Sequence, residues 1–131
     1  SRGAALVDLN RDGLLDLVVV NRRAPLELWQ NATEGAGNWI AVTPRQDGAN
    51  GFAVGAWVEL RCADGRILTQ ELTVGGGHAG GQAAPLHFGL GDATTAEIRV
   101  LWPDGTASDW RTLPANRAVT LWRDGTALAE R

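Results

Sequence analysis

The residues best placed for chemistry form an acidic loop near the start of the chain, Asp8-Leu9-Asn10-Arg11-Asp12-Gly13-Leu14-Leu15-Asp16. Side-chain oxygens stand at loop positions one, three, five and nine, and glycine stands at position six. This spacing predicts a tight loop around a hard cation, because calcium takes about 6 to 8 oxygen ligands and glycine permits the sharp turn. We expect Ca²⁺ to be bound by Asp8, Asn10, Asp12, the carbonyl of Leu14, and Asp16.

The loop does not fit an EF-hand. That motif needs a glutamate at loop position twelve and a helix on each side, whereas this position is Val19 and the flanks are strand-like. An acidic turn that holds no metal is the alternative. Carboxylates crowded into so short a segment repel one another unless a cation neutralises them, and this favours the metal site.

A second candidate site lies on a predicted hairpin, whose segments 54–62 and 66–74 flank a short loop at residues 63–65 that contains glycine. Pairing around that loop places Val58 and Leu60 on an inner apolar face. Alternation then forces the neighbouring side chains outward. The outward set is Trp57, Glu59 and Arg61, opposite Glu71, Thr69 and Ile67.

The outward set suggests recognition of a partner, because an exposed tryptophan offers a flat apolar face beside polar groups. A sugar ring would stack on Trp57, and Trp122 is a second stacking candidate. Glu59, Arg61 and Glu71 would be the polar neighbours. Paired glutamates also occur in glycosidases, but two solvated side chains on a hairpin explain Glu59 and Glu71 more simply.

Other catalytic and metal-binding patterns are missing from the sequence. His78, His87 and Cys62 do not have the spacing of zinc ligands, so we expect His87 to be structural and keep His78 as a weak metal candidate. There is no Gly-x-Ser-x-Gly motif, and the glycine-rich segment 75–81 lacks the Gly-Lys-Ser/Thr ending of a phosphate loop. We expect a connection at 75–81 and a protein that is not an enzyme.

Short apolar runs separated by Asp-Gly turns predict strands throughout. The first strands are expected at 4–7, 14–20 and 26–29, followed by a linker at 32–37. A hairpin around residues 103–105 is expected to place Trp102 and Trp110 in the core. Its outer face would pair Arg99 with Asp109 and Glu97 with Arg111. A last strand at 117–122 completes six or seven strands, suited to an antiparallel sandwich or open barrel.

The composition and charge of the chain exclude some classes of binding partner. The chain has 131 residues, a net charge of -3 and no basic run, so neither nucleic acid nor membrane insertion is expected. The single cysteine excludes an internal disulfide framework. Because methionine is absent even from position 1, we expect a processed or excised piece of a longer product.

The acidic loop also resembles a known family. The chain is similar to one FG-GAP or VCBS repeat, which forms a blade of an integrin-type β-propeller. The similarity covers residues 3–19 and continues to Leu28-Trp29-Gln30-Asn31. The resemblance implies calcium in this loop and a turn at Asn31, although Asn31-Ala32-Thr33 is also a glycosylation sequon. A single blade cannot bury its faces, so it would pack against a propeller that lies outside this chain.

The rest of the chain resembles the ASPIC and UnbV domain, which follows such repeats in bacterial proteins and in secreted proteins of the cartilage-acidic-protein type. The matching stretches are residues 38–40, 54–60, 75–77, 85–91, 100–105 and 113–117. The departures are Trp57, where a polar residue is usual, and residues 78–82, where the family tends towards Ser-Tyr-Leu-Ser-Gln.

Together these observations predict an all-β chain with a calcium-binding repeat and linker at 1–37 and a β-sandwich domain at 38–131. The expected function is a non-catalytic, extracytoplasmic scaffold or adhesion module that binds proteins or glycans, with a structural metal. A carbohydrate-binding module using exposed Trp57 is the alternative. An accessory domain of a larger enzyme is a third.

Overall fold

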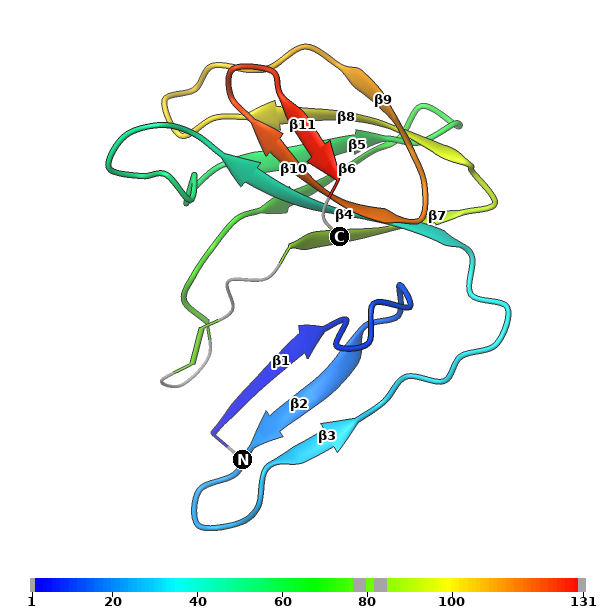
Figure 1. Cartoon of the computed structure of the whole chain (residues 1–131), viewed down its shortest axis with the longest axis vertical. Helices are drawn as coiled ribbons and strands as arrows, with labels where there is room; N and C mark the ends of the chain where they lie inside the picture. The colour runs from blue at the N-terminus through cyan, green and yellow to red at the C-terminus, as the bar shows by residue number, and fades with distance from the viewer. Residues whose placement is uncertain (1, 77–79, 82–84, 130–131) are drawn as a thin grey trace. The chain divides into compact units, whose positions relative to one another are not determined.

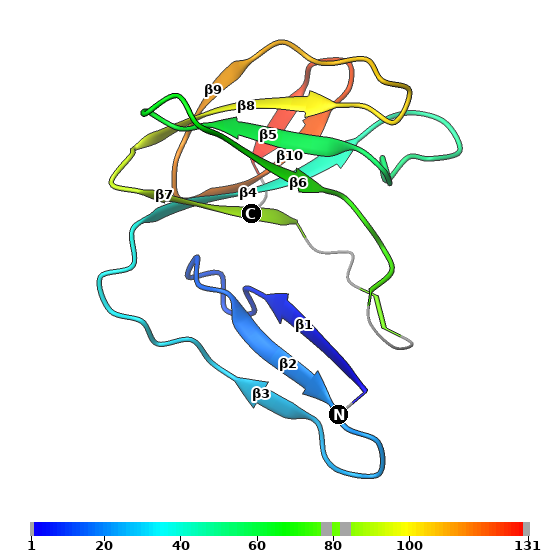
Figure 2. The same cartoon turned by 180° about the vertical axis from the view of Figure 1, so that it is seen from behind.

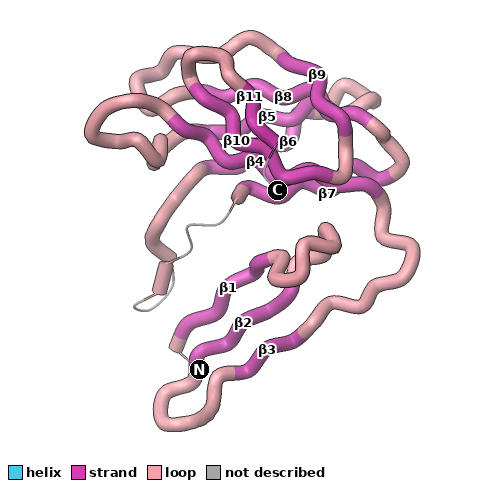
Figure 3. The backbone as a smooth tube through the Cα atoms, viewed as in Figure 1, coloured by secondary structure: helices cyan, strands magenta, loops and turns pink. Residues whose placement is uncertain are grey.

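The computed structural model describes residues 2–76, 80–81 and 85–129, and all regular structure in them is β-strand (Figure 3). Nowhere in these ranges is there a helix long and apolar enough to cross a membrane. The strands are β1 (Gly3–Val7), β2 (Asp16–Val20), β3 (Glu27–Trp29), β4 (Asn38–Arg45), β5 (Trp57–Arg61), β6 (Ile67–Glu71), β7 (Leu86–Gly91), β8 (Thr95–Leu101), β9 (Arg111–Pro114), β10 (Arg117–Trp122) and β11 (Ala127–Ala129). The predicted all-β class is confirmed.

The strands form three sheets, ordered β1-β2-β3, β11-β10-β4-β7 and β6-β5-β8-β9 (Figure 1). The chain divides into two compact units: residues 1–36 with 73–84, and residues 37–72 with 85–131. The first unit holds the three-stranded sheet and the second holds both four-stranded sheets. The segment 73–84 therefore groups with the first unit, whereas the sequence analysis placed it in the second domain.

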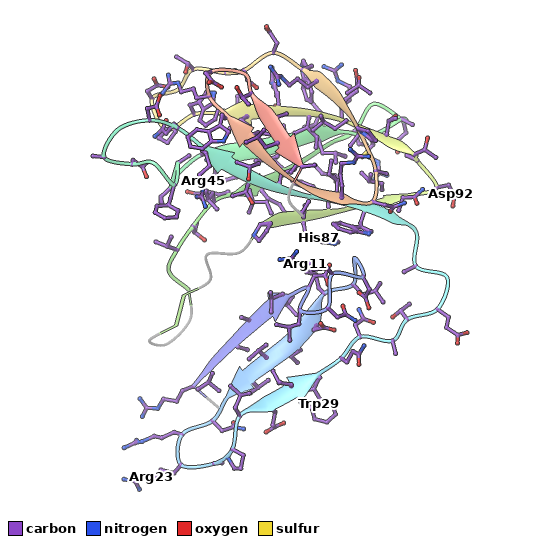
Figure 4. The ribbon with its side chains drawn as sticks, in the orientation of Figure 1. Arg11, Arg23, Trp29, Arg45, His87 and Asp92 are labelled. Atoms are coloured by element: carbon purple, nitrogen blue, oxygen red, sulfur yellow. The ribbon has the colours of Figure 1, made fainter. Side chains whose placement is uncertain are left out.

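The first unit is an antiparallel meander, in which β2 pairs with β1 on one side and β3 on the other. Its strands overlap the predicted ones and end at the predicted residues, but β1 begins at Gly3 rather than Ala4, β2 at Asp16 rather than Leu14, and β3 at Glu27 rather than Leu26. Leu28 and Trp29 on β3 are each 61% exposed, and Figure 4 labels Trp29 on this strand.

The second unit is a sandwich whose two sheets bury their facing side chains against each other; Figure 2 shows it from behind. Every described strand pairing is antiparallel except that of β10 with β4, which is parallel. The core residues are Ile40, Val42, Ala53, Ala56, Val58, Leu60, Phe88, Ala96, Ile98, Val100, Trp102, Val119 and Leu121. Alternation along each strand supplies this apolar layer, as expected for packed antiparallel sheets.

The hairpin of β5 and β6 has the predicted register. Trp57 lies opposite Glu71, and Leu60 lies opposite Leu68. The Cys62 N–H donates to the Arg66 carbonyl at 2.8 Å, and Gly65 adopts a φ of 85°, the left-handed conformation that this turn requires. Val58 and Leu60 are buried, which confirms the inner face of β5.

The hairpin of β8 and β9 departs from its predicted register. Leu101 bridges Ala107 as expected, but Ile98 lies opposite Arg111 rather than Trp110. One extra residue between Ala107 and Arg111 forms a β-bulge, and there the Val100 N–H donates to the Ser108 hydroxyl at 2.9 Å. A shift of one residue reverses the faces of the side chains beyond it.

The bulge overturns two expectations. Trp102 is a core residue, 5% exposed, but Trp110 is only half-buried and lies against arginines of the outer face. The expected pairs of Arg99 with Asp109 and of Glu97 with Arg111 are also wrong. Both β8 side chains pair instead with β5, the neighbour on the other side.

Candidate functional site

The acidic loop joins β1 to β2, and its backbone turns sharply inside that connection. Arg11, labelled in Figure 4, has a φ of 63°, and Gly13 has a φ of 89°. Glycine adopts this conformation without the penalty that a Cβ incurs. The two left-handed residues bring the side chains at positions 8, 10 and 12 back over the loop's own amides.

Carboxylate and amide oxygens occupy the interior of the loop. Asp8 accepts the N–H groups of Asp12 at 3.1 Å and of Gly13 at 2.8 Å. The Asn10 Oδ1 accepts the same Asp12 N–H at 3.2 Å, so oxygens of Asp8 and Asn10 converge on one point. Asp12 accepts the Leu14 N–H at 2.8 Å, and its other oxygen accepts the Asn10 side-chain amide at 2.7 Å.

Asp16 ties the loop to the end of the three-stranded sheet. It is 2% exposed, and its two oxygens accept the N–H groups of Leu9 at 3.1 Å and of Asn31 at 2.8 Å. A buried carboxylate needs such bonds, because an unpaired charge is costly to remove from water. The Asn31 Oδ1 in turn accepts the Thr33 N–H at 3.1 Å, which gives Asn31 the role of a turn residue.

The donor set fits a hard cation in kind, since it consists of carboxylate, amide and carbonyl oxygens. A carboxylate has about four lone-pair sites, so an oxygen that accepts an amide keeps capacity for a metal. Asp8, Asn10, Asp12, Asp16 and the Leu14 carbonyl would hold the ion. Yet within residues 2–76, 80–81 and 85–129 no three acidic, histidine or cysteine side chains converge as a metal cluster. As folded here, the carboxylates bond to loop amides.

The outer face of the β6-β5-β8-β9 sheet carries the second candidate site. Cross-strand pairing aligns Glu59 with Arg99 and Arg61 with Glu97. Arg99 Nε donates to Glu59 at 2.5 Å, and Arg61 donates to Glu97 at 3.3 Å. The Glu59 side chain is only 14% exposed, so it is fixed within the sheet surface rather than projecting from it.

Trp110 lies over these ion pairs. Its ring centroid is 4.0 Å from the guanidinium carbon of Arg61 and 4.7 Å from that of Arg99. These distances permit cation–π attraction to both arginines. The sequence analysis missed Trp110, Arg99 and Glu97 as members of this surface, because the bulge and the β5–β8 neighbourhood depend on contacts distant in sequence.

Trp57 is 42% exposed on the same face, as the register predicted. The structure thus brings together Trp57, Glu59 and Arg61 on β5 with Glu71 on β6. Trp122 does not join them: it belongs to β10 in the other sheet and lines a cavity between the sheets. Calcium ligation and ligand binding by all these residues stay predictions.

The remaining candidates have simple positions. His87 lies in β7 and stacks on Trp39, with ring centroids 5.5 Å apart and planes 9° from parallel. Within the glycine-rich segment, Gly76 and Gly80 form an isolated bridge. His78 lies outside the described residues.

Comparison with known proteins adds a family match. Residues 46–128 match the family described as ASPIC and UnbV. The chain is 31% identical over 106 residues to Cartilage acidic protein 1 of Xenopus tropicalis, and 32% identical over 107 residues to the proteins of that name from Mus musculus and Homo sapiens. These alignments cover 79% of this chain and 16% of each relative, so the chain spans a small part of the relatives' length.

Proposed function

Because the chain belongs to the ASPIC and UnbV family, we propose that it is a non-catalytic, calcium-binding scaffold or adhesion module that binds proteins or glycans. The observation that carries the proposal is the acidic loop, in which Asp8, Asn10 and Asp12 direct oxygens into one sharply turned connection. We assign the first unit to an FG-GAP or VCBS repeat, as the blade of a propeller that continues outside this chain.

The proposed metal is structural. Bound calcium would offset the repulsion between the Asp8 and Asp12 carboxylates and fix the connection between β1 and β2. Asp16 already anchors that connection to Asn31, so an ordered loop would hold the edge of the sheet in one geometry.

A location outside the cytoplasm, either secreted or periplasmic, is part of the proposal. Extracellular calcium modules work with dissociation constants of about 10⁻⁴ to 10⁻³ M, and a loop without a bidentate glutamate suits that weak class. The absence of catalysis is also proposed, since Glu59 is committed to Arg99 and is poorly placed for acid–base work.

Titration calorimetry with Ca²⁺ tests the metal site. Wild type should bind one ion, and Asp12→Ala should abolish binding because it removes a central carboxylate. Asp92→Ala, which removes an exposed acid from the other unit, is the matched control and should bind as wild type does. Equal calcium binding by wild type and Asp12→Ala would reject the assignment.

A second candidate function is carbohydrate binding, favoured by the exposure of Trp57 beside Glu71 and the Glu59–Arg99 pair. An indole face exposed on a rigid sheet stacks on a sugar ring, with charged neighbours for its hydroxyls. A glycan array should lose its signals with Trp57→Ala and keep them with Trp29→Ala, an exposed tryptophan of the first unit. Identical profiles for Trp57→Ala and wild type would exclude this surface.

A further inference from the structure

A cavity of about 300 Å³ opens between the two sheets of the sandwich. One wall comes from β8 and residues 107–111, and the other from residues 121–125. Val100, Trp102 and Leu121 form its apolar floor, and each is buried. Its volume is at the lower end of the range for small-molecule pockets, which is about 300 to 1,000 Å³.

The β-bulge turns an arginine toward this cavity. Beyond the bulge, Arg111 lies opposite the buried Ile98, so it shares the inner face instead of facing Glu97 on the outside. Its guanidinium rests against the turn after β10: a Cβ on Gly125 would lie 2.8 Å from Arg111 Nη2. Bulges re-aim side chains in this way beside functional sites.

The Arg111 side chain is half-buried, and its guanidinium forms no hydrogen bond or ion pair among the residues that the structure describes, although its charge acts on nearby Asp124. The other cation of the cavity, Arg123, is committed: it bonds to Asp104 and Thr106 and lies over the Trp102 ring. An arginine is costly to withdraw from water without a partner.

The acids at the cavity form no hydrogen bond with the Arg111 side chain among the described residues. Asp124 accepts the Thr126 N–H at 2.7 Å, and this bond is the main cause of its lowered pKa; the charge of Arg111 is a smaller cause. Asp109 is exposed at the rim, where it can accept hydroxyl groups. The cavity thus combines an apolar floor, a guanidinium without a bonded partner and a rim acceptor.

We propose that this cavity binds a small hydroxylated carboxylate. The planar guanidinium of Arg111 matches a carboxylate with two parallel hydrogen bonds. The ligand's carbon skeleton lies against Trp102 and Leu121, and its hydroxyls face Asp109. A free sugar acid and the terminal uronic acid of a polysaccharide share this chemistry. The simpler role for Arg111, covering the open end of the core with its aliphatic stem, requires no ligand.

Nuclear magnetic resonance titration of the intact chain with D-glucuronate tests the site, because the indole N–H signals of Trp102 and Trp122 report on the cavity walls. Saturable shifts are expected with D-glucuronate, and none with D-glucose, which lacks the carboxylate. Arg111→Gln should weaken binding at least about tenfold, as expected for loss of charge-assisted hydrogen bonds. Arg66→Gln, an exposed arginine paired with Asp64, is the matched control.

Arg111→Lys covers the case in which the glutamine variant fails to fold, because it keeps the stem and the charge but not the planar fork; it should also bind more weakly. A disaccharide ending in glucuronic acid separates the two sources: comparable affinity indicates a polysaccharide end, and binding of the monosaccharide alone indicates a free acid. The proposal is overturned if D-glucuronate gives no saturable shift, if D-glucose gives the same shifts, or if both Arg111 variants bind as tightly as wild type.

Discussion

Replacing Trp102 and Trp110 separately should give very different losses of stability, although simple hairpin pairing treats the two residues alike. Trp102 is 5% exposed between the sheets, so Trp102→Ala removes a whole buried indole and leaves a cavity. Such truncations cost about 3 to 5 kcal/mol. Trp110 is half-buried on the outer face, and its alanine variant loses partial burial and two cation–π contacts. That sum is about 1 to 2 kcal/mol.

Urea unfolding followed by circular dichroism measures both losses. With a slope of about 1 to 3 kcal/mol per molar urea, the midpoint should fall by about 1 M or more for Trp102→Ala, and by clearly less for Trp110→Ala. The slopes should match that of wild type. Trp102→Phe and Trp110→Phe preserve the comparison if the larger truncation unfolds the domain. Equal losses at the two positions would refute the bulge and the assignment of faces that follows from it.

Three further predictions concern charge, backbone and metal. The pKa of Asp104 is lowered from 3.8 to about 2, mainly by its hydrogen bond to Arg123 and secondly by its bonds to Thr106. Because the folded pKa is depressed, this carboxylate stabilises the fold above pH 3.8, and the stabilisation is lost as the pH falls toward 2. Arg123→Gln should raise that pKa toward 3.8 in a carboxylate NMR titration, and an unchanged titration would contradict the pair. Gly125→Ala should lower the thermal stability more than Gly105→Ala does. Both glycines have a positive φ, so each alanine adds about 1 kcal/mol of strain, but only the Cβ at position 125 would also press on the Arg111 guanidinium. Equal losses of stability would show that the guanidinium moves aside. Calcium at about 100 times its dissociation constant should stabilise the first unit by about 2.7 kcal/mol. The rise in melting temperature should be reversed by a chelator and absent from Asp12→Ala. A melting temperature that does not change with the chelator would count against the metal site.

The two hairpins show how far local sequence can predict this fold. At Asp64 and Gly65 the turn chemistry and alternation were enough to predict the register of β5 and β6. At Asp104 and Gly105 the same reasoning holds only as far as Ala107. After Ala107 the register shifts at the bulge, where the Val100 N–H donates to the Ser108 hydroxyl. This shift depends on packing between strands that are distant in sequence, so local pattern does not predict it.

The ion pairs show the same limit. Arg99 and Glu97 could pair with oppositely charged residues from the strand on either side of β8. Proximity in sequence favours Asp109 and Arg111, whereas the structure pairs them with Glu59 and Arg61. Which neighbour pairs with them is decided by the sheet order, because β5 supplies Glu59 and Arg61 directly opposite. Sheet order depends on contacts distant in sequence, so the alternation within one hairpin cannot predict it.

The acidic loop was predictable in residue type but not in its anchoring. Spacing identified the oxygens of Asp8, Asn10 and Asp12 and the need for Gly13 to turn the chain. The bond from the Asn31 N–H to Asp16 joins residues 15 positions apart, and only the packed three-stranded sheet brings them together.

The parallel pairing of β4 with β10 has a consequence for synthesis on the ribosome. β4 is a central strand of its sheet, yet its partner lies far along the chain: the bonded residues Trp39 and Asn116 are 77 positions apart. At about 5 to 20 residues per second, translation leaves one side of β4 unpaired for several seconds. During that interval β7 can already pair with one side of β4, whereas the side that β10 later covers presents open amide and carbonyl groups to other chains.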